Sequence, residues 1–161
     1  GSQLSQGTLV RVRLSDLAVS TWGMPTSGYG MTVDSQGHVW TCSGNVARFD
    51  VATETWQTAY AGGNGGCMED GNGTLWLAND PMVGVDINTM AVVQTIDLPS
   101  YVHGISIDFY GYVWGPAIYN NEAYRVDPVA GTIDTVTGLN YPYTYSDMTG
   151  FALSNAGGPI G

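Results

Sequence analysis

The chain is a succession of short segments in which apolar and polar residues alternate, separated by Gly, Pro, Asn and Asp. Such alternation is typical of β-strands with one buried face, and it recurs between residues 8 and 136. The segments are rich in Val, Thr, Tyr and Trp, which favour pleated sheets. Because no stretch shows apolar residues at helical spacing, the sequence predicts an all-β protein.

An internal repeat organises these segments. Its core is Asp-x-x-Gly-x-apolar-Trp, which occurs in residues 29–40, 65–76 and 103–114 and, with Leu153 in place of the Trp, in residues 147–153. The repeated aspartates are Asp34, Asp70, Asp108 and Asp147, spaced 36, 38 and 39 residues apart. The Asp side chain is expected to bond amides of a tight turn, and the Gly to supply its positive φ. Each copy therefore predicts two strands joined by a turn.

A second pair of strands follows each Trp. The third strands are expected at 46–50, 83–86 and 123–128, and the fourth at 55–59, 92–96 and 132–136. Four short antiparallel strands in roughly 40 residues are the size of one β-propeller blade. A blade cannot bury both of its faces alone, so Trp40, Trp76 and Trp114 are expected in the core between adjacent blades.

The predicted fold is a β-propeller of four-stranded antiparallel blades, over residues 7–155, with three whole blades and one split between the termini. The expected ranges are 1–6 for a cloning remnant and leader, 7–25 for a half-blade, 27–62, 63–100 and 101–139 for whole blades, 142–155 for a second half-blade and 156–161 for a tail. The half-blades could close a four-bladed ring within one chain, or two chains could pair into eight blades. Four blades are at the small end for propellers, which favours a homodimer or a propeller fragment.

Composition and charge exclude several functions. The chain of 161 residues has four arginines, no lysine and fourteen acids, giving a net charge of −10. Without a basic patch it is not expected to bind nucleic acid or an anionic membrane, and it has no apolar run of about 20 residues. Cys42 and Cys67 form either a disulfide or two buried thiols. The acidic, Gly- and Tyr-rich composition favours a secreted, periplasmic or cell-surface protein, where a disulfide would persist.

The blade pattern resembles that of the streptogramin (virginiamycin B) lyases and of NHL-type propellers. The shared features are Gly-x-x-x-Asp-x-x-Gly-x-x-Trp and, after it, apolar-x-Arg-apolar-Asp, and they cover residues 8–153. The resemblance implies a propeller and, for the lyases, metal-assisted opening of a cyclic depsipeptide antibiotic by elimination. Activity does not follow from the fold, because propellers host many unrelated functions.

The residues that carry the lyases' chemistry are matched only in part. The resemblance implies histidines just before the blade-opening Gly of neighbouring blades, a Glu two residues before one of them, and a magnesium ion. His103 occupies one such histidine position. The equivalent histidine positions hold Tyr29, Gly65 and Pro142, and the Glu positions hold Tyr101 and Gly63. These departures argue against an enzyme and leave His103 as the candidate catalytic residue of that alternative.

The expected channel rim is rich in aromatic and amide side chains. The candidate ligand-binding residues are Tyr29, Asn79, Asp80, Tyr101, His103, Tyr119, Asn120 and Tyr143. Tyrosines offer apolar area together with a hydroxyl, which suits a polar small molecule, a sugar or a peptide. No metal or cofactor is expected, and the alternative is a weak Mg²⁺ or Ca²⁺ site near Asp80 and Glu122.

The sequence therefore predicts a non-catalytic β-propeller module for binding or interaction, with itself as one possible partner. The alternative hypothesis is a streptogramin-lyase-like, metal-assisted enzyme that uses His103. A third hypothesis is a propeller fragment whose main property is assembly.

Overall fold

The computed structural model describes residues 7–146 and 148, and these contain fourteen β-strands and no helix. The strands are β1 (Thr8–Val12), β2 (Val19–Gly23), β3 (Gly30–Val33), β4 (Val39–Ser43), β5 (Asn45–Asp50), β6 (Thr55–Tyr60), β7 (Cys67–Glu69), β8 (Thr74–Leu77), β9 (Met82–Asp86), β10 (Val92–Ile96), β11 (Ser106–Ile107), β12 (Val113–Ala117), β13 (Glu122–Asp127) and β14 (Thr132–Thr137). A search of this part of the chain for a long apolar helix that could cross a membrane finds none. The expected leader, tail and most of the second half-blade lie outside the described residues.

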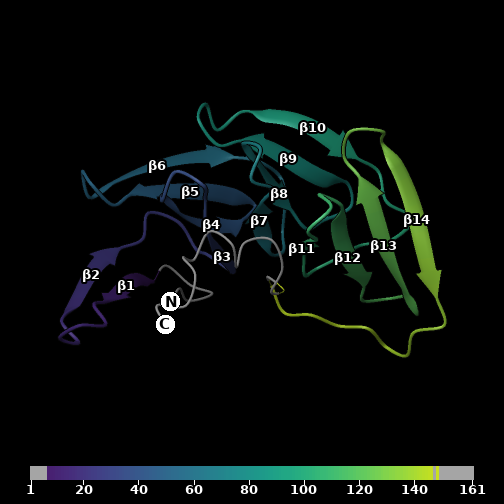
Figure 1. The fold of residues 1–161 in the computed structure, drawn as a ribbon, viewed down its shortest axis with the longest axis horizontal. Coiled ribbons are helices and arrows are strands. Elements are labelled where there is room, and N and C mark those ends of the chain that lie inside the picture. The colour runs from purple at the N-terminus through teal and green to yellow at the C-terminus, as the bar shows by residue number, and fades with distance from the viewer. Residues whose placement is uncertain (1–6, 147, 149–161) are drawn as a thin grey trace.

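The strands form one two-stranded sheet and three four-stranded sheets, each antiparallel and in chain order. The four-stranded blades are β3–β6, β7–β10 and β11–β14. Figure 1 shows the sheets arranged as a fan, with β1–β2 at one end and β11–β14 at the other. The central innermost strand, β7, contacts both β3 and β11. The predicted all-β fold of four-stranded antiparallel blades is confirmed.

An aspartate after each innermost strand holds the repeat together. The Oδ1 atom of Asp34 accepts hydrogen bonds from the amides of Gln36 and His38, both at 2.9 Å, and Oδ2 accepts one from the indole of Trp40 at 2.8 Å. The same three bonds recur from Asp70 to Trp76 and from Asp108 to Trp114. The turn glycine has a φ between 86° and 93° in all three copies, a conformation that disfavours other residues. The repeat motif is thus a turn tied to a core indole.

A second set of aspartates closes the outer turn of each blade. Asp50, Asp86 and Asp127 each accept hydrogen bonds from the amides two and three residues further along the chain. These bonds lower the pKa of Asp50, where the bond from the Thr53 amide has the largest effect. They lower the pKa of Asp86 in the same way, and there the bond from the Thr89 amide has the largest effect. With the three inner aspartates, at least six of the fourteen acids serve turns. Much of the negative charge is therefore structural rather than a sign of a ligand.

Neighbouring innermost strands approach backbone to backbone, which explains the Gly that opens the repeats. A Cβ atom at Gly30 would lie 2.8 Å from the Cα atom of Gly66, the equivalent Gly of the next blade. The close approach continues beyond the third blade. There Ile105 donates its amide to the Ser146 carbonyl, and Met148 donates its amide to the Ile105 carbonyl, each at 2.8 Å. Residues 146 and 148 thus lie beside β11, on the side where a further innermost strand would belong.

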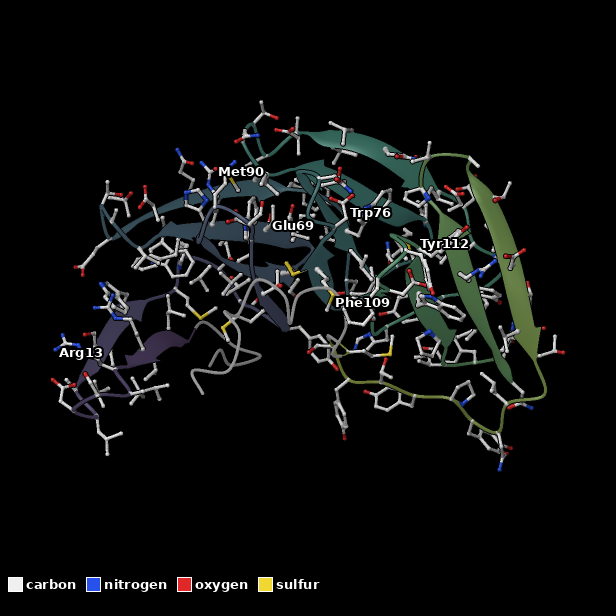
Figure 2. All side chains as sticks on the ribbon, viewed as in Figure 1. Arg13, Glu69, Trp76, Met90, Phe109 and Tyr112 are labelled. Carbon is white, nitrogen blue, oxygen red and sulfur yellow. A yellow bond between two sulfur atoms is a disulfide. The ribbon has the colours of Figure 1, made fainter. Side chains whose placement is uncertain are left out.

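The core consists of buried clusters between adjacent sheets. Trp40 and Trp76 are 0% and 1% exposed, as predicted. Figure 2 shows Trp76 between the second and third blades, where it packs against residues of both. Trp114 differs from the expectation, because it is only half-buried. Its side chain lines a hollow of about 220 Å³ on a face of the third blade that no described blade covers.

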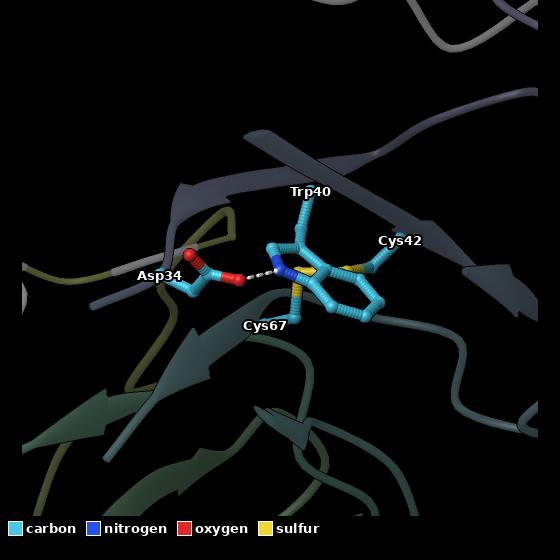
Figure 3. The surroundings of a disulfide bond; sticks show 4 residues. All are labelled: Asp34, Trp40, Cys42 and Cys67. Atoms are coloured by element: carbon cyan, nitrogen blue, oxygen red, sulfur yellow. Dashed lines mark hydrogen bonds between the residues drawn. A yellow bond between two sulfur atoms is a disulfide. The ribbon is translucent and has the colours of Figure 1, made fainter. Parts of the chain in front are cut away.

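A disulfide joins the first two blades. Cys42 of β4 and Cys67 of β7 are bonded, with their Cα atoms 6.2 Å apart, and both are 0% exposed. The Trp40 indole lies in the same buried cluster as the two cysteines. Figure 3 shows it beside the disulfide, with its nitrogen directed to Asp34. The crosslink and the Asp34–Trp40 pair therefore stabilise the same interface between blades.

The first prediction concerns this aspartate. Asp34→Ala removes a carboxylate that is 2% exposed and serves three N–H donors, which leaves buried donors unpaired. We expect a loss of about 2–4 kcal/mol in the free energy of unfolding, measured by chemical denaturation. Asp16→Ala is the matched control, because the Asp16 side chain is exposed where it bonds Ala18, and it should cost under about 1 kcal/mol. Equal losses in the two variants would contradict the structural role of the motif.

The second prediction concerns the disulfide. It closes a loop between residues separated by 25 positions, so replacing both cysteines by Ser should cost about 3–4 kcal/mol of stability. Thermal unfolding with and without reductant measures this. Reductant should destabilise the natural chain and leave the double variant unchanged. Two titratable thiols in the unreduced, denatured chain would show that the bond does not form.

Candidate functional site

His103 lies at the centre of a group of aromatic rings on one rim of the fan. It stands between β10 and β11, and its carbonyl accepts a hydrogen bond from the Gly66 amide at 2.8 Å. Tyr29 precedes β3 and is held by a bond from its amide to the Cys42 carbonyl at 2.8 Å. Tyr101, Tyr119 and Tyr143 come from loops that flank β11–β14. The segments before β3 and β11, the β12–β13 loop and the segment after β14 thus bring these side chains together.

The rings pack around the imidazole from several sides. The Tyr29 ring centroid lies 4.5 Å from that of His103, and the Tyr143 ring is stacked at 6.2 Å with an interplanar angle of 13°. The Tyr101 hydroxyl is hydrogen-bonded to Nδ1 of His103. Tyr119 extends the group outward, 6.0 Å from the ring of Tyr101. The result is a partly exposed aromatic surface with a polar atom near its centre.

Burial shifts the protonation of this group towards neutral forms. It lowers the pKa of His103, and no other cause contributes clearly. It also raises the pKa of Tyr101, with smaller contributions from Tyr119 and Tyr143. Burial likewise raises the pKa of Tyr29. The Tyr29 hydroxyl has no hydrogen bond of ordinary geometry, although Tyr143 lies close enough to raise its pKa further. At neutral pH the surface therefore carries donors and acceptors without formal charge.

Two adjoining hollows follow this surface. The first, of about 480 Å³, is lined by Asn64, Tyr101, His103, Ile118, Tyr119 and Tyr143. The second, of about 760 Å³, is lined by Ile118, Tyr119, Asn120, Asn121, Glu122 and Tyr141. They share Ile118 and Tyr119, so a ligand longer than one ring could occupy both. Glu122 is the acidic residue of this lining, and it lies in the second hollow.

Tyr141 marks the far wall of the second hollow. The residue is 85% exposed, and its φ of +47° is unusual for a residue other than Gly. The Asn121 side chain holds it there by accepting a hydrogen bond from the Tyr141 amide at 3.1 Å. Exposed aromatic residues in sparsely populated backbone conformations are candidates for function.

The structure gathers most of the predicted binding residues and leaves two apart. Tyr29, Tyr101, His103, Tyr119 and Tyr143 form the first group, and Asn120 lines the second hollow. Asn79 and Asp80 do not line either hollow. The Asn79 side chain donates to the Gly62 carbonyl, which ties it to the segment between β6 and β7, and the Asp80 carboxylate accepts from the Leu98 amide and so closes a loop of the second blade.

Sequence reasoning missed Asn64, Ile118 and Tyr145. Asn64 lies in the Gly-rich approach to β7, and Ile118 directly follows β12, positions that the blade repeat could have indicated. Tyr145 packs edge-on against Tyr143 at 4.9 Å, but no repeat pattern places it.

The residues around His103 do not fit the magnesium ion implied by the lyase resemblance. Hard cations prefer carboxylate and carbonyl oxygens, and the hollow that His103 lines has no carboxylate. Asp80 and Glu122 are engaged with the Leu98 amide and the Tyr124 hydroxyl. Among residues 7–146 and 148 no three His, Cys, Asp or Glu side chains are placed to share a metal. No metal-dependent step is therefore assigned to this chain.

Comparison with solved structures identifies the fold. A virginiamycin B lyase from Staphylococcus aureus is 14% identical with a TM-score of 0.69, covering 84% of this chain and 54% of the lyase. A streptogramin B lyase is 17% identical with a TM-score of 0.70, covering 82% of this chain and 49% of that one. The extracellular domain of a hybrid two-component system from B. thetaiotaomicron is 14% identical with a TM-score of 0.66, covering 83% and 20%.

The comparisons establish a β-propeller fold of the streptogramin-lyase type, and at these identities they establish the fold alone. The chain spans about half the length of the lyases it matches. No protein-family model matches the chain, and none of the curated proteins does. The predicted resemblance is thus confirmed at the level of structure.

The third prediction concerns the protonation of His103. Its pKa in the folded chain should lie below the ordinary value of 6.5, as followed by proton NMR of the imidazole. Because folding lowers this pKa, the neutral ring contributes stability above pH 6.5 that is lost as the pH falls towards the folded value. Tyr143→Ala uncovers the stacked side of the ring, so the midpoint should rise towards 6.5. A midpoint at or above 6.5 in the natural chain would contradict the burial of the imidazole.

Proposed function

We propose that this chain is a non-catalytic β-propeller module that binds a neutral polar ligand, in the first place a carbohydrate, on the aromatic surface around His103. One observation carries the proposal: tyrosines from separate loops gather around an imidazole with a lowered pKa, beside a hollow lined by no formally charged side chain. Binding sites combine apolar and aromatic area with a few placed polar groups, and this surface has both.

A sugar fits this surface better than an ion does. Tyrosine rings present flat apolar faces to the C–H faces of a sugar ring, and their hydroxyls meet its polar edge. Asn64 adds an amide with both donors and an acceptor. The continuation into the second hollow favours an oligosaccharide over a single sugar. An uncharged peptide is the competing ligand, since tyrosines also serve peptide recognition.

A lyase-like enzyme is the second candidate, and the position of His103 favours it. The imidazole stands before the blade-opening Gly104, where the resemblance implies a catalytic histidine, and its lowered pKa would suit a base. Against this, the surrounding residues lack the second histidine, the Glu and the oxygen ligands that the mechanism would need. The binding module is therefore the better supported function.

We also propose that the protein is exported. The disulfide between Cys42 and Cys67 supports this, because disulfides persist in oxidising compartments. One structural neighbour is an extracellular domain, which is consistent with such a location.

The fourth prediction tests the ligand surface by isothermal titration with neutral hexasaccharides of glucose, mannose and N-acetylglucosamine. At least one should bind, and Tyr119→Ala should weaken it about tenfold or more, because Tyr119 borders both hollows. Tyr110→Ala is the matched control, since Tyr110 is 89% exposed in the turn between β11 and β12, and it should leave affinity unchanged.

Other outcomes separate the candidates. No binding of any hexasaccharide, together with Tyr119-dependent binding of an uncharged tyrosine-containing peptide, would replace the sugar by a peptide. Turnover of a cyclic depsipeptide that His103→Ala abolishes would overturn the non-catalytic assignment.

A further inference from the structure

One face of the β1–β2 sheet is bare and apolar. Val10, Val12, Leu14 and Leu17 are 39%, 47%, 88% and 69% exposed. They come from β1 and the turn that follows it. The opposite face of the same sheet is covered, since Leu9 packs against Phe49 of the first blade.

The repeat shows what these four residues correspond to. Adding 73 to each number gives Val83, Val85, Ile87 and Met90, which are 3%, 0%, 1% and 8% exposed. The turns agree in detail. The Arg13 amide donates to the Ala18 carbonyl at 2.9 Å, and the Leu17 amide donates to the Arg13 carbonyl at 2.8 Å. In the second blade the Asp86 amide donates to the Ala91 carbonyl and the Met90 amide to the Asp86 carbonyl, each at 2.9 Å. Leu17 and Met90 also share a positive φ, 58° and 62°. The bare face is therefore the structural equivalent of a buried one.

In the second blade this equivalent face covers a tryptophan. Val83, Val85, Ile87 and Met90 lie in one buried cluster with Trp40 of the preceding blade. The third blade repeats the arrangement, with Val126 in one cluster with Trp76. By the same rule, the face of Val10 and Val12 requires a blade that presents an uncovered tryptophan.

The third blade presents such a face. Trp114, the counterpart of Trp40 and Trp76, is half-buried beside a hollow that Pro116, Ala123 and Met148 also line. The two bare faces stand at opposite ends of the fan in Figure 1, so they cannot meet within one described chain. Each face nevertheless corresponds to one side of the buried interface between neighbouring blades, so the two faces are complementary to each other.

We propose that a second copy of this chain closes the propeller head to tail. The Val10–Val12 face of each copy covers the Trp114 face of the other, giving two identical interfaces about a two-fold axis. Residues 146 and 148 pair with Ile105 beside β11. In the closed pair they occupy the innermost position of a shared blade, whose outer strands are β1 and β2 of the second copy. A ring of two chains would also match the lyases in size, because one chain spans about half of them.

The fifth prediction is a mass of 34.2 kDa by light scattering on a sizing column, twice the 17.1 kDa chain. Val12→Asp places a charge in the proposed interface but at an exposed position of the single chain, so it should give a folded species of 17.1 kDa. Val93→Asp is the matched control, because Val93 is 58% exposed on the outer strand β10, and it should leave the mass of the pair unchanged.

The opposite face gives a second, independent test. Pro116→Asp should also yield single chains, with its fold checked by circular dichroism. Mixing it with Val12→Asp should restore pairs, because one of the two interfaces then joins two natural faces. If Pro116→Asp left the mass of the pair unchanged, the β1–β2 faces of the two copies would have to meet each other, and head-to-tail closure would be overturned. A natural chain of 17.1 kDa, or an open series of larger species, would overturn the closed pair.

Discussion

Each blade of this protein has two apolar faces, and it can bury them only against its neighbours. The burial of Trp40 and Trp76, the disulfide between the first two blades and the glycines at the innermost strands all serve this need. The constraint also explains the exceptions. Trp114 is only half-buried and the Val10–Val12 face is exposed because they lie at the ends of the described fan, not because their residues differ from those of the buried interfaces.

The aspartate-to-indole bond links local sequence to this packing. One carboxylate fixes the turn through two amides and orients the tryptophan that fills the next interface. A short motif thus determines both the hairpin and the side chain that the neighbouring blade must cover.

The fold could be predicted in detail from the sequence because the repeat encodes turn, strand and core residue at fixed spacing. Part of the site could be predicted too, since Tyr29, Tyr101 and His103 stand beside the glycines that open the blades. Asn79 and Asp80 could not be distinguished from ligand residues, because their backbone partners, Gly62 and Leu98, follow from loop conformation rather than from pattern. The half-burial of Trp114 could not be predicted either, because the repeat marks it as a core residue like Trp40 and Trp76 and does not say that no described blade follows it.

The aromatic surface and the open ends belong to one architecture, in which innermost segments meet near the axis and place His103 among rings from several loops. Small-angle X-ray scattering of the chain tests this architecture most directly, because a closed ring and an open fan differ in both mass and shape. A propeller closed by two copies predicts a compact disc with the mass of two chains. A curve that fits the single fan, at the mass of one chain, would contradict the closure of blade faces on which the whole account rests.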